Sequence, residues 1–345
     1  MERTHSHEML DSYVAKKKDV TKWVCLGIIF VCLSFLMIST FQWKYDFSSN
    51  ILTIRVWQYL LAFFSGGALG LSGLLLQKLT KNNLSDISIL GIGSLNIIFI
   101  VLFIMFQYDG TTGSLALVRA YLPLISIGSS ILGTSIVYTL SKNKPDNCEK
   151  FAITGIALQF IFEAISVTLA NPRILENQST QTQVNTEIQN FAYGRFPDIQ
   201  ALSKIGIWRT TTIVSVVVIT MLLFVVYKFR KEIDLIELNE ELAKFYGVRV
   251  KFLKGFLYIC VAVIVGIESA MIGSISLLGI VAASFSRLLF KNKSDINIIT
   301  SFLIGGMLVL LAAFISINLN KNIPIGFLST SIIAPIFLYL LFKKR

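Results

Sequence analysis

Charged residues are scarce in this sequence, and so are histidine and cysteine. Only 15% of the 345 residues are Asp, Glu, Lys or Arg, whereas 54% are hydrophobic. Soluble domains carry about 25% charged residues, so the composition excludes an ordinary soluble protein. The two histidines have no ligand-spaced companions, which excludes a recognisable metal site. The four cysteines are expected to be small packing residues rather than a disulfide framework.

Motifs for catalysis are also absent. The chain has no phosphate-binding loop of the form GxxxxGKS or GxxxxGKT, so it is not expected to bind ATP in the usual way. It also lacks the paired carboxylates and clustered histidines on which acid–base or metal chemistry depends. We therefore predict that the chain is not an enzyme and has no catalytic residues, no metal ligands and no cofactor of its own.

Long stretches without charge dominate what is present. Such runs occupy residues 23–43, 56–77, 87–108, 120–141, 296–320 and 322–342. A helix needs about 20 residues to cross the hydrocarbon core of a bilayer, so each run is a candidate span. Further spans are expected at about 151–170 and 205–227. The predicted fold class is all-α: a polytopic membrane protein with a polar cytoplasmic tail over residues 1–22 and one transmembrane domain over residues 23–345.

The segment 255–286 decides the number of spans. It is long for one span and short for two, and Glu268 is its one charged residue. Basic segments flank it, and basic loops lie on the cytoplasmic side, so an even number of crossings must separate them. We predict two short or tilted helices that turn near Gly273 and Ser274; a re-entrant pair satisfies the same parity. This gives ten spans with both termini cytoplasmic and most of the 31 Lys and Arg residues inside.

Two acidic residues, Glu163 and Glu268, lie within predicted spans. A carboxylate inside a membrane is costly, so it usually faces the bundle interior, a cavity or a partner. Both residues are candidates for lining or gating a pathway, and a structural hydrogen bond within the bundle explains them equally well. A proton relay needs more ionisable groups at membrane depth than the sequence contains.

The longest strongly charged segment, residues 228–254, lies between two apolar runs. Within it Leu238, Leu242, Phe245 and Tyr246 recur on one face of a predicted helix that Gly247 ends. A short amphipathic helix of this kind docks onto a soluble partner or lies on the membrane surface. The pattern alone does not choose between these two arrangements.

Six phrases stand out along the chain. They are the stretch from IRV at 54–56 to SGLLLQ at 72–77, NNLSDISILG at 82–91, GIAL at 155–158, ELAKFYGV at 241–248, GIVAASFSR at 279–287 and NIPIG at 322–326. In this order and spacing they resemble the permease subunits of type II ATP-binding cassette (ABC) importers for iron-siderophores, haem and vitamin B12, the FecCD-type family. The chain departs from the family pattern at Asn83 and Ile87, which replace prolines, at Gln58, which replaces an arginine, and at Ala283 and Ser284, which replace Pro-His.

The resemblance extends from about residue 50 to the C-terminus, and it implies ten helices per subunit and a set of partners. These are a second permease subunit, identical or paralogous, two ABC ATPase subunits that bind ATP and Mg²⁺, and an extracellular solute-binding lipoprotein. It implies docking of the binding protein at Arg55 and Lys321, although Arg55 also fits an interfacial anchor. It assigns Gly155, Gln159 and Glu163 to the translocation pathway. The implied ATPase-coupling residues are Glu240, Glu241, Leu242, Ala243, Phe245, Tyr246, Gly247 and Val248.

The expected function is therefore that of the membrane-spanning permease of an ATP-driven importer in a bacterial plasma membrane, with an iron(III)-siderophore as substrate. The alternatives are a vitamin B12 or haem importer permease, or a stand-alone secondary transporter driven by an ion gradient. The net charge of +11 is accounted for by cytoplasmic loops, so no nucleic-acid partner is expected.

Overall fold

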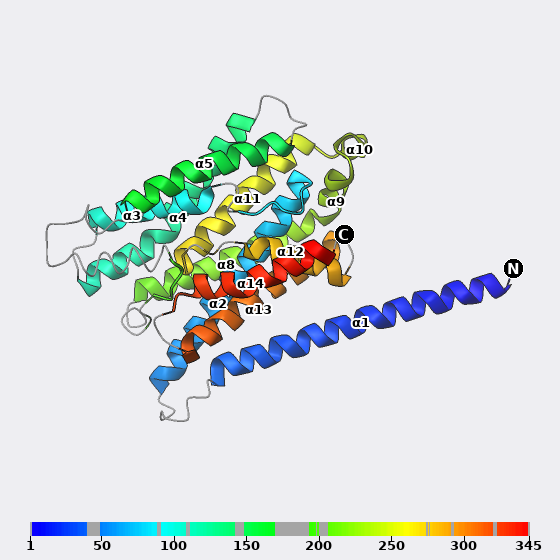
Figure 1. Ribbon diagram of the computed structural model, residues 1–345, viewed down its shortest axis with the longest axis horizontal. Coiled ribbons are helices and arrows are strands. Elements are labelled where there is room, and N and C mark those ends of the chain that lie inside the picture. Colours follow the sequence, from blue (N-terminus) through cyan, green and yellow to red (C-terminus); the bar gives the residue numbers. More distant parts are fainter. Residues whose placement is uncertain are drawn as a thin grey trace.

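The computed structural model describes residues 2–39, 49–87, 91–107, 111–141, 148–169, 193–197, 199, 206–273, 275, 277–290, 293–319 and 323–343. All regular structure within these ranges is α-helical. Figure 1 shows the helices as a bundle of rods that run roughly side by side. They are α1 Glu2–Ser39, α2 Ser49–Thr80, α3 Ile92–Gln107, α4 Thr112–Ser141, α5 Cys148–Leu169, α8 Gly206–Lys228, α9 Arg230–Leu238, α10 Glu240–Phe245, α11 Val250–Met271, α12 Leu278–Phe290, α13 Ser294–Leu319 and α14 Ile325–Lys343.

The helices agree with the predicted spans. Among the described residues, six helices are long and apolar enough to cross a membrane, and α3, α5, α12 and α14 contain shorter apolar stretches. Each of these ten lies on a run predicted from the sequence, so the all-α polytopic membrane fold is confirmed. The number of full crossings stays a prediction, because the shorter stretches fall below the roughly 20 residues that a full crossing needs.

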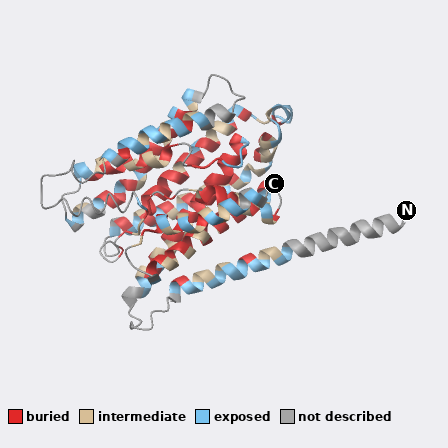
Figure 2. Ribbon diagram, in the orientation of Figure 1, coloured by how far each residue is buried: buried red, intermediate tan, exposed pale blue. Residues whose placement is uncertain are grey.

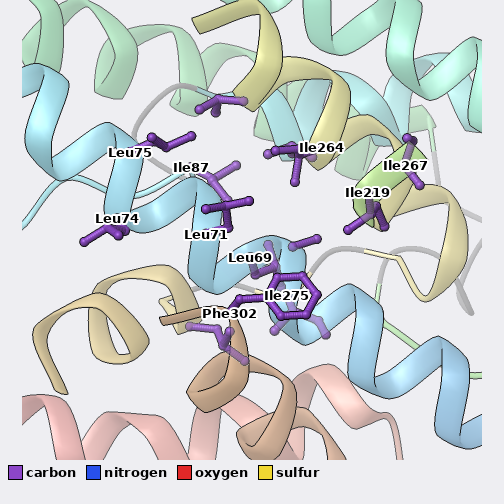
Figure 3. Packing of buried hydrophobic residues seen from close by; sticks show 14 of the residues in the cluster. Leu69, Leu71, Leu74, Leu75, Ile87, Ile219, Ile264, Ile267, Ile275 and Phe302 are labelled. Carbon is purple, nitrogen blue, oxygen red and sulfur yellow. The ribbon is translucent and has the colours of Figure 1, made fainter. Parts of the chain in front are cut away.

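Helix α2 forms the centre of the bundle. Of its most apolar stretch 83% is buried, and the helix packs against α11, α12 and α13. Leu69, Leu71, Leu74 and Leu75 of α2 belong to the same core as Ile264 and Phe302 (Figure 3). Burial is concentrated along the inner helices, whereas the outer faces are largely exposed (Figure 2). The apolar sides of α2 are thus covered by other helices, whereas the exposed apolar faces of the outer helices suit a lipid environment.

Helix α1 lies on the outside of the bundle and extends well beyond it (Figure 1). Only 11% of its apolar stretch is buried, and a mostly apolar groove of about 600 Å³ lies between it and α12, α13 and α14. The predicted tail and the first predicted span are one continuous helix, Glu2–Ser39. The start of α1, the end of α14 and helices α9 and α10 all lie toward one end of the molecule (Figure 1).

The segment 255–286 forms two helices, as predicted. Helix α11 ends at Met271, and Gly273 has a φ of +101°, a conformation that favours glycine and interrupts the helix. Helix α12 then begins at Leu278 and contains only 13 residues. The connection between them meets the loop that follows α2, because the backbone N–H of Leu277 donates to Asp86 Oδ2 at 3.2 Å. The predicted turn residue Ser274 lies outside the described residues.

Candidate functional site

The charged segment 228–254 folds into two short helices that project from the end of the bundle (Figure 1). Asn239 separates them: its backbone is extended, and its side-chain Oδ1 accepts a hydrogen bond from Glu241 N at 2.8 Å. Asparagine is among the preferred N-cap residues, so it starts α10 in a new direction. Gly247, with a φ of +83°, follows α10 and turns the chain toward α11.

Four large apolar side chains of this segment are exposed, and we call them the coupling surface: Leu238, Leu242, Phe245 and Tyr246. Their exposed fractions are 75%, 44%, 88% and 67%. The Phe245 and Tyr246 rings pack edge to face with centroids 6.1 Å apart, which holds both in one ridge. Exposed aromatic residues clustered on a polar segment mark an interaction site rather than a folding core.

The remaining predicted coupling residues support this surface. Ala243 is the fully buried residue of α10, whereas Glu241 and Gly247 are exposed. Glu240 accepts a hydrogen bond from Lys254 Nζ at 2.8 Å, an ion pair that joins α10 to the first turns of α11. Val248 is half-buried at the base of the surface. All eight predicted coupling residues therefore lie on one projecting unit.

Sequence analysis missed the ionic contact that joins this unit to the centre of the bundle. Lys78 lies in the last turn of α2, and its Nζ is 2.8 Å from Asp234 Oδ1 and 2.6 Å from Glu237 Oε2 of α9. The Lys78 side chain is completely buried. Asp234 and Glu237 are three residues apart and share one face of α9, and that spacing was the available signal. What the sequence did not reveal was which cation they face.

The residues predicted to dock a binding protein or line a pathway are spread over two helices. Arg55, at the start of α2, is 8% exposed and donates to Gln58 Oε1 at 3.1 Å, and Lys321 lies outside the described residues. On α5, Gly155 is buried, Gln159 is half-buried and Glu163 is exposed. The structure does not bring these two sets together, and their roles stay predictions.

Glu268 differs from Glu163 in its surroundings. It is 2% exposed, and its Oε2 accepts from Ser269 Oγ at 3.4 Å. Ser269 Oγ in turn accepts from the amide of Asn96 at 3.1 Å, and the Asn96 carbonyl oxygen accepts from Ser129 and Ser130. Among the described residues, Glu268 itself has only this 3.4 Å bond to its neighbour on α11, and its Oε1 is buried without a hydrogen-bond partner, so a pathway role and a structural hydrogen bond both stay predictions.

Metal binding has no support within the described part of the chain, where no three His, Cys, Asp or Glu side chains form a group able to hold an ion. The absence of a resident metal or catalytic group stays a prediction. The main feature of the site is a projecting apolar surface whose segment is connected through ion pairs to the central helix α2.

Two relatives and one solved structure are similar to this chain over most of its length. "Probable siderophore transport system permease protein YfhA" of Bacillus subtilis is 28% identical over 298 residues, covering 86% of this chain and 82% of the relative. "Vitamin B12 import system permease protein BtuC" of Photorhabdus laumondii is 25% identical over 359 residues, covering 100% and 99%. A solved structure of an inward-facing "metal-chelate type ABC transporter" has the same fold, with a TM-score of 0.75 and 20% identity over 94% of this chain and 99% of that one.

The family-level match also covers most of the chain. The sequence pattern of the FecCD transport family matches residues 23–343, from the apolar part of α1 to the last residue of α14. This range includes part of α1 and the whole of every later helix, α9 and α10 among them. The resemblance noted in the sequence is thus confirmed, and the chain belongs to the FecCD transport family.

Proposed function

We propose that this chain is the permease subunit of an ATP-driven importer that carries an iron(III)-siderophore into a bacterial cell. Its family and its relatives make it a multi-pass membrane permease of a type II ABC importer for a siderophore, hydroxamate or vitamin B12. The choice of a siderophore is supported by relatives with siderophore and iron(3+)-hydroxamate transport in their names. Vitamin B12 and haem are the alternative cargoes within the same family.

The observation that carries the proposal is the exposed coupling surface at the end of the bundle where α1 begins and α14 ends. Phe245 is 88% exposed and Leu238 75% exposed, yet both lie on a polar segment outside the candidate spans. An aromatic ridge of this kind fits a groove on a soluble partner. We assign that partner to the ABC ATPase, which binds ATP and Mg²⁺ on its own chain, and we place this end of the bundle and both termini in the cytoplasm.

In the proposed mechanism, two ATPase subunits move together when they bind ATP and push on α10 from the cytoplasmic side. The permease tilts against a second permease subunit, identical or paralogous, and alternately opens the pathway between them to each side of the membrane. A solute-binding lipoprotein delivers the siderophore from outside at the face that contains Arg55 and, by prediction, Lys321. Gly155, Gln159 and Glu163 of α5 contribute to the pathway wall.

Uptake by a deletion strain tests the proposed cargo. A strain lacking this chain is expected to lose uptake of radiolabelled iron supplied as a hydroxamate siderophore, and the plasmid-borne chain is expected to restore it. Labelled vitamin B12 and haem supplied in parallel identify the alternative cargoes. Uptake that persists in right-side-out membrane vesicles on an ion gradient without nucleotide would instead identify a stand-alone secondary transporter.

The coupling surface is tested by co-purification. Replacing both Phe245 and Tyr246 by alanine is expected to remove the ATPase from the purified complex, because truncating an aromatic hot spot costs about 2 kcal/mol or more. The matched control is Phe106→Ala, which removes an equally exposed aromatic side chain, 82% exposed, from the last turns of α3. Retention of the ATPase by the double variant would contradict the assignment.

A further inference from the structure

We propose that Lys78 is a positioning residue that transmits movement of the coupling segment to the central helix α2. The inference rests on the proposed function, since it assumes that an ATPase pushes on α10. It goes further by naming the route along which the force reaches the membrane core. The geometry points to this route through one buried ammonium group shared by two carboxylates.

Lys78 is buried more completely than either of its partners. Its side chain is 0% exposed, while those of Asp234 and Glu237 are 32% and 19% exposed. A buried ammonium group is stable only while its partners stay in place, because separating a buried pair leaves an uncompensated charge. A displacement of α9 that left α2 behind would break both contacts at 2.8 and 2.6 Å. The two helices are therefore constrained to move as one body.

The face of α9 that contacts Lys78 is also joined to α13. Asp234 also accepts from Ser294 at the start of α13, from the backbone N–H at 3.1 Å and from the hydroxyl at 2.6 Å. Arg230 of α9 lies 2.5 Å from Asp295 of α13. Glu237 attracts Arg287 of α12 electrostatically. Lys78 thus completes a polar cluster that connects α9 with α2, α12 and α13.

The coupling segment is also linked to the bundle directly from α10. Helix α10 is joined to α11 through Glu240 and Lys254, a partly exposed pair at the surface. Both members of that pair are partly exposed, at 16% and 23%, and ion pairs of this kind contribute little. Lys78 differs because its ammonium group is fully buried and is shared by two carboxylates, which are themselves 32% and 19% exposed. Since α2 is the most deeply buried of the long spans, a push delivered through Lys78 acts on the centre of the bundle rather than on its rim.

The predicted consequence of removing Lys78 is uncoupling. In Lys78→Met the coupling surface is untouched, so the ATPase is expected to bind and to turn over ATP. Transport per ATP hydrolysed is expected to fall by about tenfold, within the range that losing one coupling contact produces. Lys78→Arg, which keeps a cation, is expected to retain most of the transport. Lys81→Met removes an exposed lysine three residues away and serves as the matched control.

A neutral triple variant separates transmission from folding. Lys78→Met alone leaves two carboxylates facing each other, which by itself destabilises the protein. The triple variant K78M/D234N/E237Q carries no charge at these three positions, so no carboxylate is left facing another, and it is expected to fold, but it still lacks the ionic link. We therefore expect the triple variant to remain uncoupled. Normal transport in the triple variant would show that Lys78 serves only stability and would overturn the inference.

The measurement uses the full transporter reconstituted in proteoliposomes with its ATPase, with ATP hydrolysis and uptake of radiolabelled iron as hydroxamate siderophore measured together. Unchanged uptake per ATP in Lys78→Met would also overturn the inference. Failure of the proposed function has a different signature, because the unmodified chain would then neither retain an ATPase nor take up the siderophore with ATP.

Discussion

Gly66 of α2 and Gly305 of α13 lie back to back, so closely that a Cβ added at either one would overlap the backbone of the other. One turn further along α2, Gly70 lies in the same way against the carbonyl oxygen of Ser301. Lipid tails are as apolar as the helices, so close van der Waals contact between backbones is what holds such a pair together. Helix α2 is thereby fixed along α13, the helix whose first residue, Ser294, also donates to Asp234 of α9.

Gly305→Ala is expected to destabilise the bundle by about 1–3 kcal/mol, the usual cost of an added methyl group in a tightly packed site. The reason is that the new methyl group meets the Gly66 backbone, which has no flexible side chain to move away. Thermal unfolding in detergent measures the loss. Gly128→Ala on α4, where no described atom lies within 4 Å of the added Cβ, is the control and should be at least as stable as the unmodified chain, because alanine favours a helix more than glycine does. Equal stability of the two variants would contradict the packing argument.

Asn96→Ala is expected to lower the thermal stability of the bundle more than a surface substitution of the same kind. The Asn96 amide joins Ser269 of α11 to Ser129 and Ser130 of α4, and each interhelical hydrogen bond contributes about 0.6 kcal/mol in a membrane protein. Asn318→Ala is the matched control, since among the described residues its amide donates only to the Phe314 carbonyl of its own helix. The same unfolding temperature for both variants would show that the bundle does not depend on this cluster.

Asn239→Ala is expected to weaken ATPase binding without affecting membrane insertion. The Asn239 side chain accepts from Glu241 N and caps α10, and losing an N-cap costs about 1 kcal/mol. Because α10 has only six residues, this loss frays the helix that carries Leu242 and Phe245. The affinity of the purified chain for its ATPase measures the effect. Asn239→Asp, which keeps the capping oxygen, should restore it, and failure to do so would point to another role for the amide.

Much of the fold was predictable because hydrophobic runs determine where helices lie in a membrane. The helices at 92–107, 148–169 and 206–228 begin and end close to the predicted spans, and α11 and α12 divide as the parity of basic loops required. The amphipathic face of Leu242 and Phe245 was also visible, because its 3.6-residue period is local.

The features that escaped prediction depend on contacts between distant segments. Lys78 was visible only as one basic residue at the end of a span, and its partners are more than 150 positions away. The break at Asn239 was missed because the apolar face continues from Leu238 across the cap. Similarly, Glu163 and Glu268 were indistinguishable in the sequence, and only the arrangement of the bundle makes one exposed and the other buried.

Glu163→Leu is expected to reduce siderophore uptake while leaving the stability of the chain unchanged or increased. Glu163 is an exposed carboxyl on α5, an apolar helix, and a carboxylate that faced lipid would be strongly unfavourable. We therefore expect the side chain to face a polar pathway or a partner subunit in the assembled transporter, and replacing it to remove a polar contact from that surface. The control is Phe160→Leu, one turn earlier and 68% exposed, which keeps the surface apolar. Uptake and detergent unfolding measured on the same preparations decide the matter: normal uptake in Glu163→Leu would remove this residue from the pathway.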